Sequence, residues 1–436
     1  MASILITFVG KQDPYSDNSE KEGSIVTLVR YLMGQGISFK KVILLCTQGT
    51  QERAEATEDW LETDVKIARS QIEIIPVCSE LSDDPVNLLL ASREAYRAIE
   101  TVQQDWVEGD CLEFNASSGT PVMKSSWSIL EAAGKTPPNS KVWQVRDPRE
   151  IKPGQEAVFL NDVSVLKDEF DIQVIKRQIA NYNYSGAFVD LKLSNLHSSE
   201  IEALLNYGQY RLAFDFDRAF NSIQNLPLPF TETVLPQLAA LRRKDKRALL
   251  EEIYSKIQIK DKKEEYSDLL VLLFSFQETL LRLLVVQKTL PNEVQASWER
   301  NEEKVKNQIS TFDGGKLNLF LENYILKNGK KLQTLDDRGQ HFSRISLKAI
   351  LDYQPDSRDS ELLPLIESLE NYCGQRNDYI HDLKGISKIE KKGEILNALK
   401  KILQKIGSST SDNPFDRLNK ELSSLLEVEQ KRGQNK

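Results

Sequence analysis

Short apolar segments alternate with longer amphipathic segments over the first 145 residues, and this alternation constrains the fold more than any other feature. Five runs have the length and the β-branched content of buried strands. Strands that alternate with helices predict a mostly parallel sheet with helices on both faces. The expected strands are Ile4–Val9, Lys41–Cys46, Gln71–Val77, Asp110–Asn115 and Lys141–Val145, and the expected helices are Ile25–Met33, Thr50–Ser70, Asp84–Val107 and Val122–Ala133.

From about Leu166 the pattern becomes helical throughout, with short connections such as the turn or linker at Leu226–Pro229. The residues beyond Ser408 are polar, and we expect them to be ordered only in part. The sequence therefore predicts an α/β domain followed by an all-helical half. Helices are expected at Phe170–Tyr182, Ser198–Tyr207, Tyr210–Ile223, Leu235–Ile257, Glu264–Lys288, Val294–Ser310, Leu317–Lys327, Ser346–Asp352, Glu361–Asp382 and Lys391–Ile406.

Length and charge limit the classes of protein to which this chain can belong. With 436 residues it is too long for one ordinary core, so two or three domains are expected. The net charge of −8 argues against a surface that coats nucleic acid, but it leaves room for a small phosphate-contacting site. Basic residues cluster at Arg242–Arg247, Lys260–Lys263 and Lys384–Lys405, and we interpret these clusters as solvated helix faces.

No targeting or membrane-spanning segment is expected. The apolar run Ile4–Val9 is too short for a signal peptide and has no basic leader. The most apolar stretch, Leu269–Val286, is interrupted by residues that include Ser275, Gln277, Glu278 and Arg282, and no stretch is expected to reach the length needed to span a bilayer. The four cysteines, Cys46, Cys78, Cys111 and Cys373, have no paired short spacing. Buried, reduced thiols in a cytoplasmic protein are therefore expected, and without CxxC or HxxxH spacing no metal site is predicted.

The loop after the fourth expected strand is the first candidate site. Ligands of open parallel sheets bind outside the carboxyl ends of the strands. There Ser117–Thr120 offers backbone amides and hydroxyls, Gly119 permits a close backbone approach, and the helix expected from Val122 favours an anion. Gly10–Ser24 follows the first strand and belongs to the same edge. These loops could cradle a phosphodiester, although loops of this composition are often only caps and turns, and no GxGxxG fingerprint is present.

The second candidate site is the segment Asn371–His381. Metal-independent RNA cleavage needs a group that moves protons near neutral pH, which suits His381, and a fixed positive donor, which suits Arg376. Five positions on a helix amount to about 140° of rotation, so these two side chains would not share a face. Asn377 and His381, four apart, would share one. Convergence of Arg376 with His381 therefore requires a bend, for which Gly374 is a candidate, or a second subunit.

The spacing of an arginine and a histidine alone is poor evidence, because it arises often by chance. A single histidine near a helix end is more often structural than catalytic. The other two histidines, His197 in a turn and His341 in a polar segment, are expected to have no chemical role.

The order of these parts resembles the CARF–HEPN ribonucleases of type III CRISPR systems. Residues 1–160 resemble a CARF domain, a Rossmann-like sensor of ring nucleotides, in which Ser117–Met123 is similar to the family's nucleotide-contacting loop. Residues 161–260 resemble the helical connector. Residues 261–436 resemble the all-helical HEPN domain, whose motif of an arginine, a polar residue and a histidine is matched by Arg376, Asn377 and His381.

The resemblance implies a function and a set of site residues. Arg376 and His381 would be the catalytic pair, supported by Asn377, in a cleft shared by a homodimer. The enzyme would cut single-stranded RNA without a metal, by attack of a ribose 2′-hydroxyl, leaving a 2′,3′-cyclic phosphate and a 5′-hydroxyl. Cyclic tetra- or hexa-adenylate would be the allosteric activator, and no DNA or membrane partner is expected. The implied activator contacts are Gly10, Lys11, Gln12, Ser24, Ser117, Ser118, Gly119, Thr120 and Met123.

Two alternatives from other classes stay open. One is a non-catalytic adaptor or regulator that senses the ring nucleotide and whose HEPN-like half only dimerises. The other is an α/β enzyme that acts on a nucleotide, although the first 160 residues contain no histidine and no GxSxG or Walker sequence. A transcription factor is disfavoured, because the helical half has no obvious recognition helix and the chain is acidic.

Overall fold

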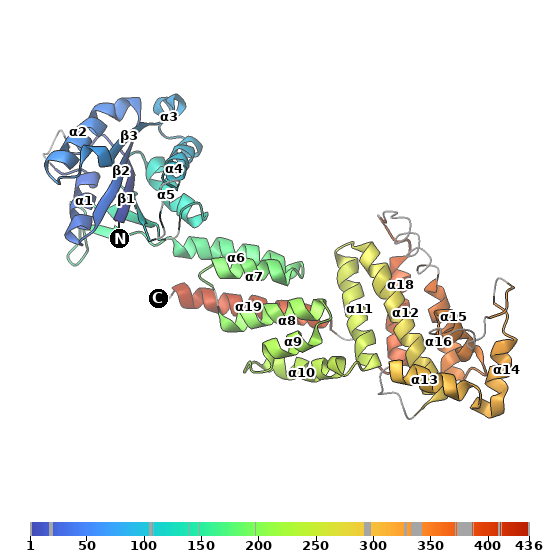
Figure 1. Cartoon of the computed structure of the whole chain (residues 1–436). Coiled ribbons are helices and arrows are strands. Elements are labelled where there is room, and N and C mark those ends of the chain that lie inside the picture. The colour runs from blue at the N-terminus through green and yellow to red at the C-terminus, as the bar shows by residue number, and fades with distance from the viewer. Residues whose placement is uncertain are drawn as a thin grey trace. The chain divides into compact units, whose positions relative to one another are not determined.

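The computed structural model describes residues 2–16, 21–103, 107, 109–137, 139–147, 149–196, 198–291, 298–326, 329–332, 342–370, 372, 386, 388–408, 410 and 412–434. The chain divides into two compact units (Figure 1). Unit 1 comprises residues 1–174, 194–196 and 430–436, and unit 2 comprises residues 175–193 and 197–429.

Unit 1 is built on a six-stranded sheet with the strand order β3-β2-β1-β4-β5-β6. All neighbouring strands are parallel except β5 and β6, which confirms the predicted mostly parallel sheet. The sixth strand was not expected, because three residues are too few to carry a periodic signal. The strands are β1 (Ala2–Phe8), β2 (Ser38–Cys46), β3 (Ile72–Pro76), β4 (Cys111–Asn115), β5 (Lys141–Val145) and β6 (Val158–Leu160).

Helices cover both faces of this sheet, as predicted (Figure 1). Successive residues of a strand point to opposite faces, so Ile4, Ile6 and Phe8 of β1 enter one core while Leu5 enters the other. The core of Ile4 includes α4 (Leu88–Gln103) and α5 (Pro121–Ala132). The core of Leu5 includes α1 (Ser24–Gly34) and α2 (Gln51–Thr63), and α3 (Ser79–Asp83) precedes α4.

Two helices that the sequence predicts as continuous are broken in unit 2. The expected Tyr210–Ile223 divides into the end of α8 (Ser199–Leu212) and α9 (Phe216–Ile223), and the expected Leu235–Ile257 divides into α10 (Pro229–Arg242) and α11 (Lys246–Lys262). At each break a residue with positive φ, Phe214 or Lys244, precedes an aspartate. That aspartate caps the next helix, since Asp215 accepts from the Arg218 amide and Asp245 from the Ala248 amide.

The second half of unit 2 is a helical core centred on α12 (Tyr266–Thr289). The expectation that no segment is long enough to span a membrane is wrong. By length and composition alone α12 could do so, since its most apolar window has a mean hydropathy of 2.0. Within the structure, however, 61% of that window is buried. Helices α11 and α15 pack against it. Among the described residues this half also contains α13 (Trp298–Ile309), α14 (Lys316–Glu322), α15 (Arg344–Asp352), α16 (Ser357–Ser368) and α18 (Lys392–Lys405).

Three predicted helices here have other bounds. The expected Leu317–Lys327 ends at Glu322, and a short β-bridge between Ile325 and Lys331 follows. Only the first part of the expected Glu361–Asp382 lies within the described residues, and there the helix begins earlier, at Ser357. The expected Val294–Ser310 is described only from Trp298 onwards.

The C-terminal residues, expected to be ordered only in part, form the long helix α19 (Pro414–Gln434). Its apolar positions Phe415, Leu418, Leu422 and Leu426 are all fully buried. They recur every three or four residues, a helical stripe that the polar composition conceals. Within unit 2 this helix packs against α7 (Tyr184–Leu193), since the Tyr184 hydroxyl donates to Asn419 Oδ1 at 2.8 Å. The helix α6 (Ser164–Ala180) precedes α7 in the chain.

Candidate functional site

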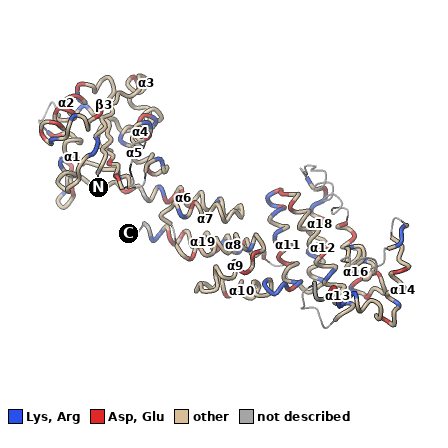
Figure 2. The backbone as a smooth tube through the Cα atoms, viewed as in Figure 1, with Lys and Arg blue, Asp and Glu red and all other residues tan. Residues whose placement is uncertain are grey.

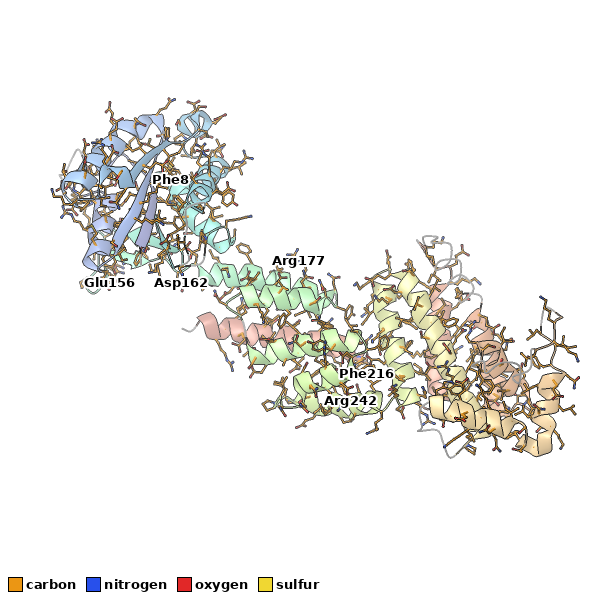
Figure 3. The ribbon with its side chains drawn as sticks, in the orientation of Figure 1. Phe8, Glu156, Asp162, Arg177, Phe216 and Arg242 are labelled. Carbon is orange, nitrogen blue, oxygen red and sulfur yellow. The ribbon has the colours of Figure 1, made fainter. Side chains whose placement is uncertain are left out.

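A pocket of about 530 Å³ lies at the carboxyl edge of the unit 1 sheet. Its walls follow β1 and β4, the two strands between which the chain order of the sheet reverses. Open α/β sheets bind ligands at such a point. Phe8, labelled in Figure 3, is the last residue of β1, and its Cβ would lie 3.1 Å from a Cβ added at Gly119 of the lining. All nine residues implied as activator contacts line this pocket: Gly10, Lys11, Gln12, Ser24, Ser117, Ser118, Gly119, Thr120 and Met123.

Other lining residues were not singled out from the sequence. Thr47, Gly49 and Thr50 follow β2, and the rule that points to the loops after β1 and β4 would also have pointed to this one. Asp13 lies inside a loop whose other residues were named, and no periodic signal marks it. The remaining lining residues are Val9, Ser82, Pro85 and Lys124.

Asp13 joins three walls of the pocket. Its Oδ2 accepts from the Gly10 amide at 3.0 Å and from the Ser118 hydroxyl, and its Oδ1 accepts from the Ile25 amide at 3.2 Å. The carboxyl group is buried, and this burial raises the pKa of Asp13, partly opposed by the hydrogen bond from Ser118. Asp13 therefore holds together the loop that follows β1 (the post-β1 loop, at Gly10), the first turn of α1 (at Ile25) and the loop that follows β4 (the post-β4 loop, at Ser118).

The post-β4 loop is held by its own side chains. Thr120 caps α5, which begins at Pro121, one residue before the expected Val122. Gly119 has φ of +92°, and a Cβ there would lie 3.0 Å from Met123 Sδ and 3.1 Å from Phe8 Cβ. Only glycine fits this left-handed, crowded position. The glycine is thus required by the packing of the loop itself, and the predicted close approach of its backbone to a ligand stays a prediction.

The charge of the lining suits an anion. Among the lining residues Lys11 and Lys124 are cationic, and Asp13 is the one carboxylate. Neither lysine has an ion-pair partner in the described part of the chain, whereas the Asp13 carboxylate is buried behind the loop amides. Backbone amides, hydroxyls and two lysines around one cavity are groups that bind phosphate oxygens.

Residues 238–423 match the family model of the Cas_Csm6 HEPN domain. Among solved structures the chain is similar to Csm6 of Enterococcus italicus bound to cyclic hexa-2′-fluoro-hexa-dAMP. The TM-score is 0.65 at 15% sequence identity, and the alignment covers 98% of this chain and 100% of that one. The chain therefore has the fold of that Csm6 over nearly its full length, and its residues 238–423 are similar to the Csm6 HEPN domain. No curated protein sequence matches it significantly.

The residues predicted to form the HEPN motif, Arg376, Asn377 and His381, lie outside the described residues, as do Gly374, His197 and His341. In the chain, the motif follows α16 and precedes α18 of the HEPN domain. Lys348 of α15 holds the end of this helix, since its Nζ contacts Glu367 Oε1 in the last turn of α16 at 2.7 Å and Glu370 Oε1, two residues beyond that turn, at 3.3 Å.

The basic clusters of the helical half have carboxylate partners. Arg242 pairs with Asp217, Lys260 with Glu265 and Asp268, and Lys392 with Asp261. Figure 2 shows acidic and basic residues interspersed along these helices. This pattern agrees with the interpretation of the clusters as solvated, ion-paired helix faces.

Within the described ranges no group of three or more His, Cys, Asp or Glu side chains could hold a metal ion.

Cysteine placement follows the prediction in part. Cys46 and Cys111 are buried free thiols, whereas Cys78 is only half-buried, and Cys373 lies outside the described residues. Cys111 is a buried packing residue. Burial raises the pKa of its thiol to about 12, so the thiol is protonated and unreactive at neutral pH.

Proposed function

We propose that this protein is a cytoplasmic endoribonuclease of CRISPR antiviral defence that a cyclic oligoadenylate activates. The observation that carries the proposal is the presence in one chain of a Csm6-type HEPN domain and of an anion-suited pocket at the β1–β4 edge of a CARF-type sheet. The related Enterococcus italicus Csm6, which has the same architecture, binds a cyclic hexanucleotide. That likeness supports cyclic tetra- or hexa-adenylate as the ligand class.

The proposed chemistry is metal-independent cleavage of single-stranded RNA. A ribose 2′-hydroxyl attacks the neighbouring phosphorus while the bond to the 5′-oxygen breaks, which leaves a 2′,3′-cyclic phosphate and a 5′-hydroxyl. His381 moves the proton, and the Arg376 guanidinium stabilises the charge on the phosphorane oxygens. Asn377, four positions before His381, orients the imidazole. Base identity is read weakly, because a phosphate-centred site carries no sequence information.

Activation couples the two domains in a homodimer. A ring of adenylates is itself symmetric, so one ring suits the two-fold axis of paired CARF domains. The ring contacts the post-β1 and post-β4 loops of each protomer. It binds the competent arrangement of the HEPN motifs more tightly than the idle one and so shifts the population toward it.

The test is cleavage of a labelled single-stranded RNA in EDTA, with and without cyclic tetra- and hexa-adenylate, by the wild type and by His381→Ala. We expect cleavage only with one of the two rings, its loss in His381→Ala, and unchanged ring binding by that variant. Tight ring binding without cleavage under any condition would instead identify an adaptor with a HEPN-like dimerisation domain. Loss of both binding and cleavage in His381→Ala would make His381 a structural residue.

A further inference from the structure

Four hydroxyl side chains line the pocket on the β1–β4 side, and their hydrogen bonds divide them into two kinds. The four are Ser24, Ser117, Ser118 and Thr120. A hydroxyl has one proton to donate and two lone pairs that accept. Phosphodiester oxygens only accept hydrogen bonds. A hydroxyl can therefore serve such a ligand only when its proton is not already given to the protein.

Ser118 and Thr120 have already donated their protons. The Ser118 hydroxyl donates to Asp13 Oδ2, and the Ser118 side chain is buried. The Thr120 hydroxyl donates to the Pro85 carbonyl at 2.7 Å and accepts from the Met123 amide at the start of α5. Both hydroxyls hold the loop together, and neither has a proton left for an anion.

Ser24 and Ser117 are placed the other way round. The Val145 amide of β5 donates to Ser117 Oγ at 2.7 Å, and Asn115 Nδ2 donates to Ser24 Oγ at 3.3 Å. Each hydroxyl thus accepts from the protein. Within the described residues neither one donates to another protein atom. Their protons remain for a group inside the pocket.

Asn115 sets the direction of this arrangement. It is the last residue of β4, and its side chain is fully buried. The Ser117 amide donates to its Oδ1 at 2.9 Å, and a backbone amide can only donate. The oxygen of the side chain must therefore face Ser117, which leaves the NH₂ group to face Ser24.

We infer that Asn115 is a positioning residue that turns the Ser24 hydroxyl proton into the pocket and orients the start of the post-β4 loop, so that Ser24 and Ser117 form the donor pair for a ligand phosphate. This inference rests on the proposed function of the pocket. It separates the four hydroxyl residues among the implied activator contacts into two hydrogen-bond donors and two residues that brace the loop. Ser24 and Ser117 contact the ligand through their side chains, whereas Ser118 and Thr120 shape the loop.

The test measures the affinity of the full-length protein for cyclic tetra- and hexa-adenylate by calorimetry, together with the melting temperature. Ser24→Ala and Ser117→Ala are each expected to weaken binding about tenfold or more, because a hydrogen bond to a charged group is lost. Their melting temperatures should stay close to that of the wild type. Ser125→Ala is the matched control, since that exposed hydroxyl on α5 donates to the Pro121 carbonyl, and its affinity should not change.

Asn115→Ala tests the positioning role through a double-mutant cycle with Ser24→Ala. If Asn115 acts through the Ser24 proton, the loss of ring affinity in the double variant should be much smaller than the product of the losses in the two single variants. Independent effects that multiply would overturn the positioning role. Unchanged affinity in both Ser24→Ala and Ser117→Ala would overturn the donor pair. A wild type that binds neither ring would instead refute the proposed activator, a result distinct from both.

Discussion

Arg211 and Glu252 form an ion pair inside unit 2, with side chains only 3% and 1% exposed. The Arg211 Nε lies 3.1 Å from both carboxylate oxygens, Nη2 lies 2.7 Å from Oε2, and Nη1 donates to the Tyr207 hydroxyl. The pair joins α8 to α11, two helices on either side of the breaks that the sequence did not predict. Each of the two buried charges is compensated by the other and by hydrogen bonds, as long as both residues are present.

Removal of one partner should therefore be costly. Glu252→Gln leaves the Arg211 charge buried without its counter-ion and is expected to lower the free energy of unfolding by about 3–5 kcal/mol. Chemical denaturation checks this value. The exposed pair between Arg242 and Asp217 is the control, since Asp217→Asn should cost less than about 1 kcal/mol. Equal effects at the two sites would contradict the argument.

Gly119→Val should destabilise the sheet domain and weaken activation. The new side chain meets Met123 and Phe8 and adopts an unfavourable positive φ, for which we expect a loss of about 2–4 kcal/mol. The activator concentration for half-maximal cleavage should rise, while the rate at saturating ring should stay unchanged. Gly134→Val separates the cost of the positive φ from the cost of the steric clash. Gly134 also has a positive φ, but no atom lies within 4 Å of a Cβ added there. Normal activation of Gly119→Val at low ring concentration would remove the loop from the site.

Glu131 of α5 should make the stability of the protein depend on pH. Burial, and then the nearby Asp162 charge, raise the pKa of Glu131 to about 7 in the folded state. Below its ordinary pKa of 4.5 both states are protonated. As the pH rises from 4.5 through 7, the unfolded state loses this proton first, so the stability of the folded state falls. Above 7 this contribution stays constant.

Glu131→Gln removes that titration and keeps the shape of the side chain. The variant should melt at a higher temperature than the wild type at pH 8, and the two should converge toward pH 5. Melting curves between pH 5 and 8 check the prediction, with the exposed Glu100→Gln as the control. Parallel curves for the wild type and Glu131→Gln would show that Glu131 does not titrate in this range.

Gly208→Ala should destabilise the packing of α8. A Cβ at this position would lie 2.7 Å from Tyr184 Cδ2 and 2.8 Å from Leu418 Cδ2, so two neighbouring helices must shift. We expect a loss of about 1–3 kcal/mol in denaturation experiments. Gly393→Ala in α18 meets nothing within 4 Å and should instead be neutral or stabilise by about 0.5–1 kcal/mol. A stable Gly208→Ala would show that the three helices pack more loosely.

The alternation of strands and helices was predictable because each buried strand is a nearly continuous apolar run, such as Val42–Cys46 of β2. The pocket was predictable from one topological rule, which places the loops after β1 and β4 at the same edge. The residues that organise the pocket were not predictable. Asp13 and Asn115 act through hydrogen bonds between segments distant in sequence, and such pairings leave no local pattern.

The helix breaks show the same limit. The apolar stripe continues across Phe214 and across Lys244, so periodicity alone predicts one helix in each case. The local signal is the aspartate that follows, Asp215 or Asp245, which caps the next helix. The C-terminal helix α19 was missed for the opposite reason, because its mean composition is polar although its stripe of leucines is regular.

The position of α19 sets the order in which the chain can complete its folding. Phe415 and Leu418 fill the space between helices that are encoded more than 200 residues earlier, as the contact of Leu418 with Gly208 shows. The helices α7 and α8 therefore acquire this neighbour only after the chain has been synthesised beyond Leu418. The β-sheet domain has all its strands by residue 160 and can fold during translation. A polypeptide interrupted before α19 would thus contain all six strands of the sheet, while its α7 and α8 would lack the helix that packs against them.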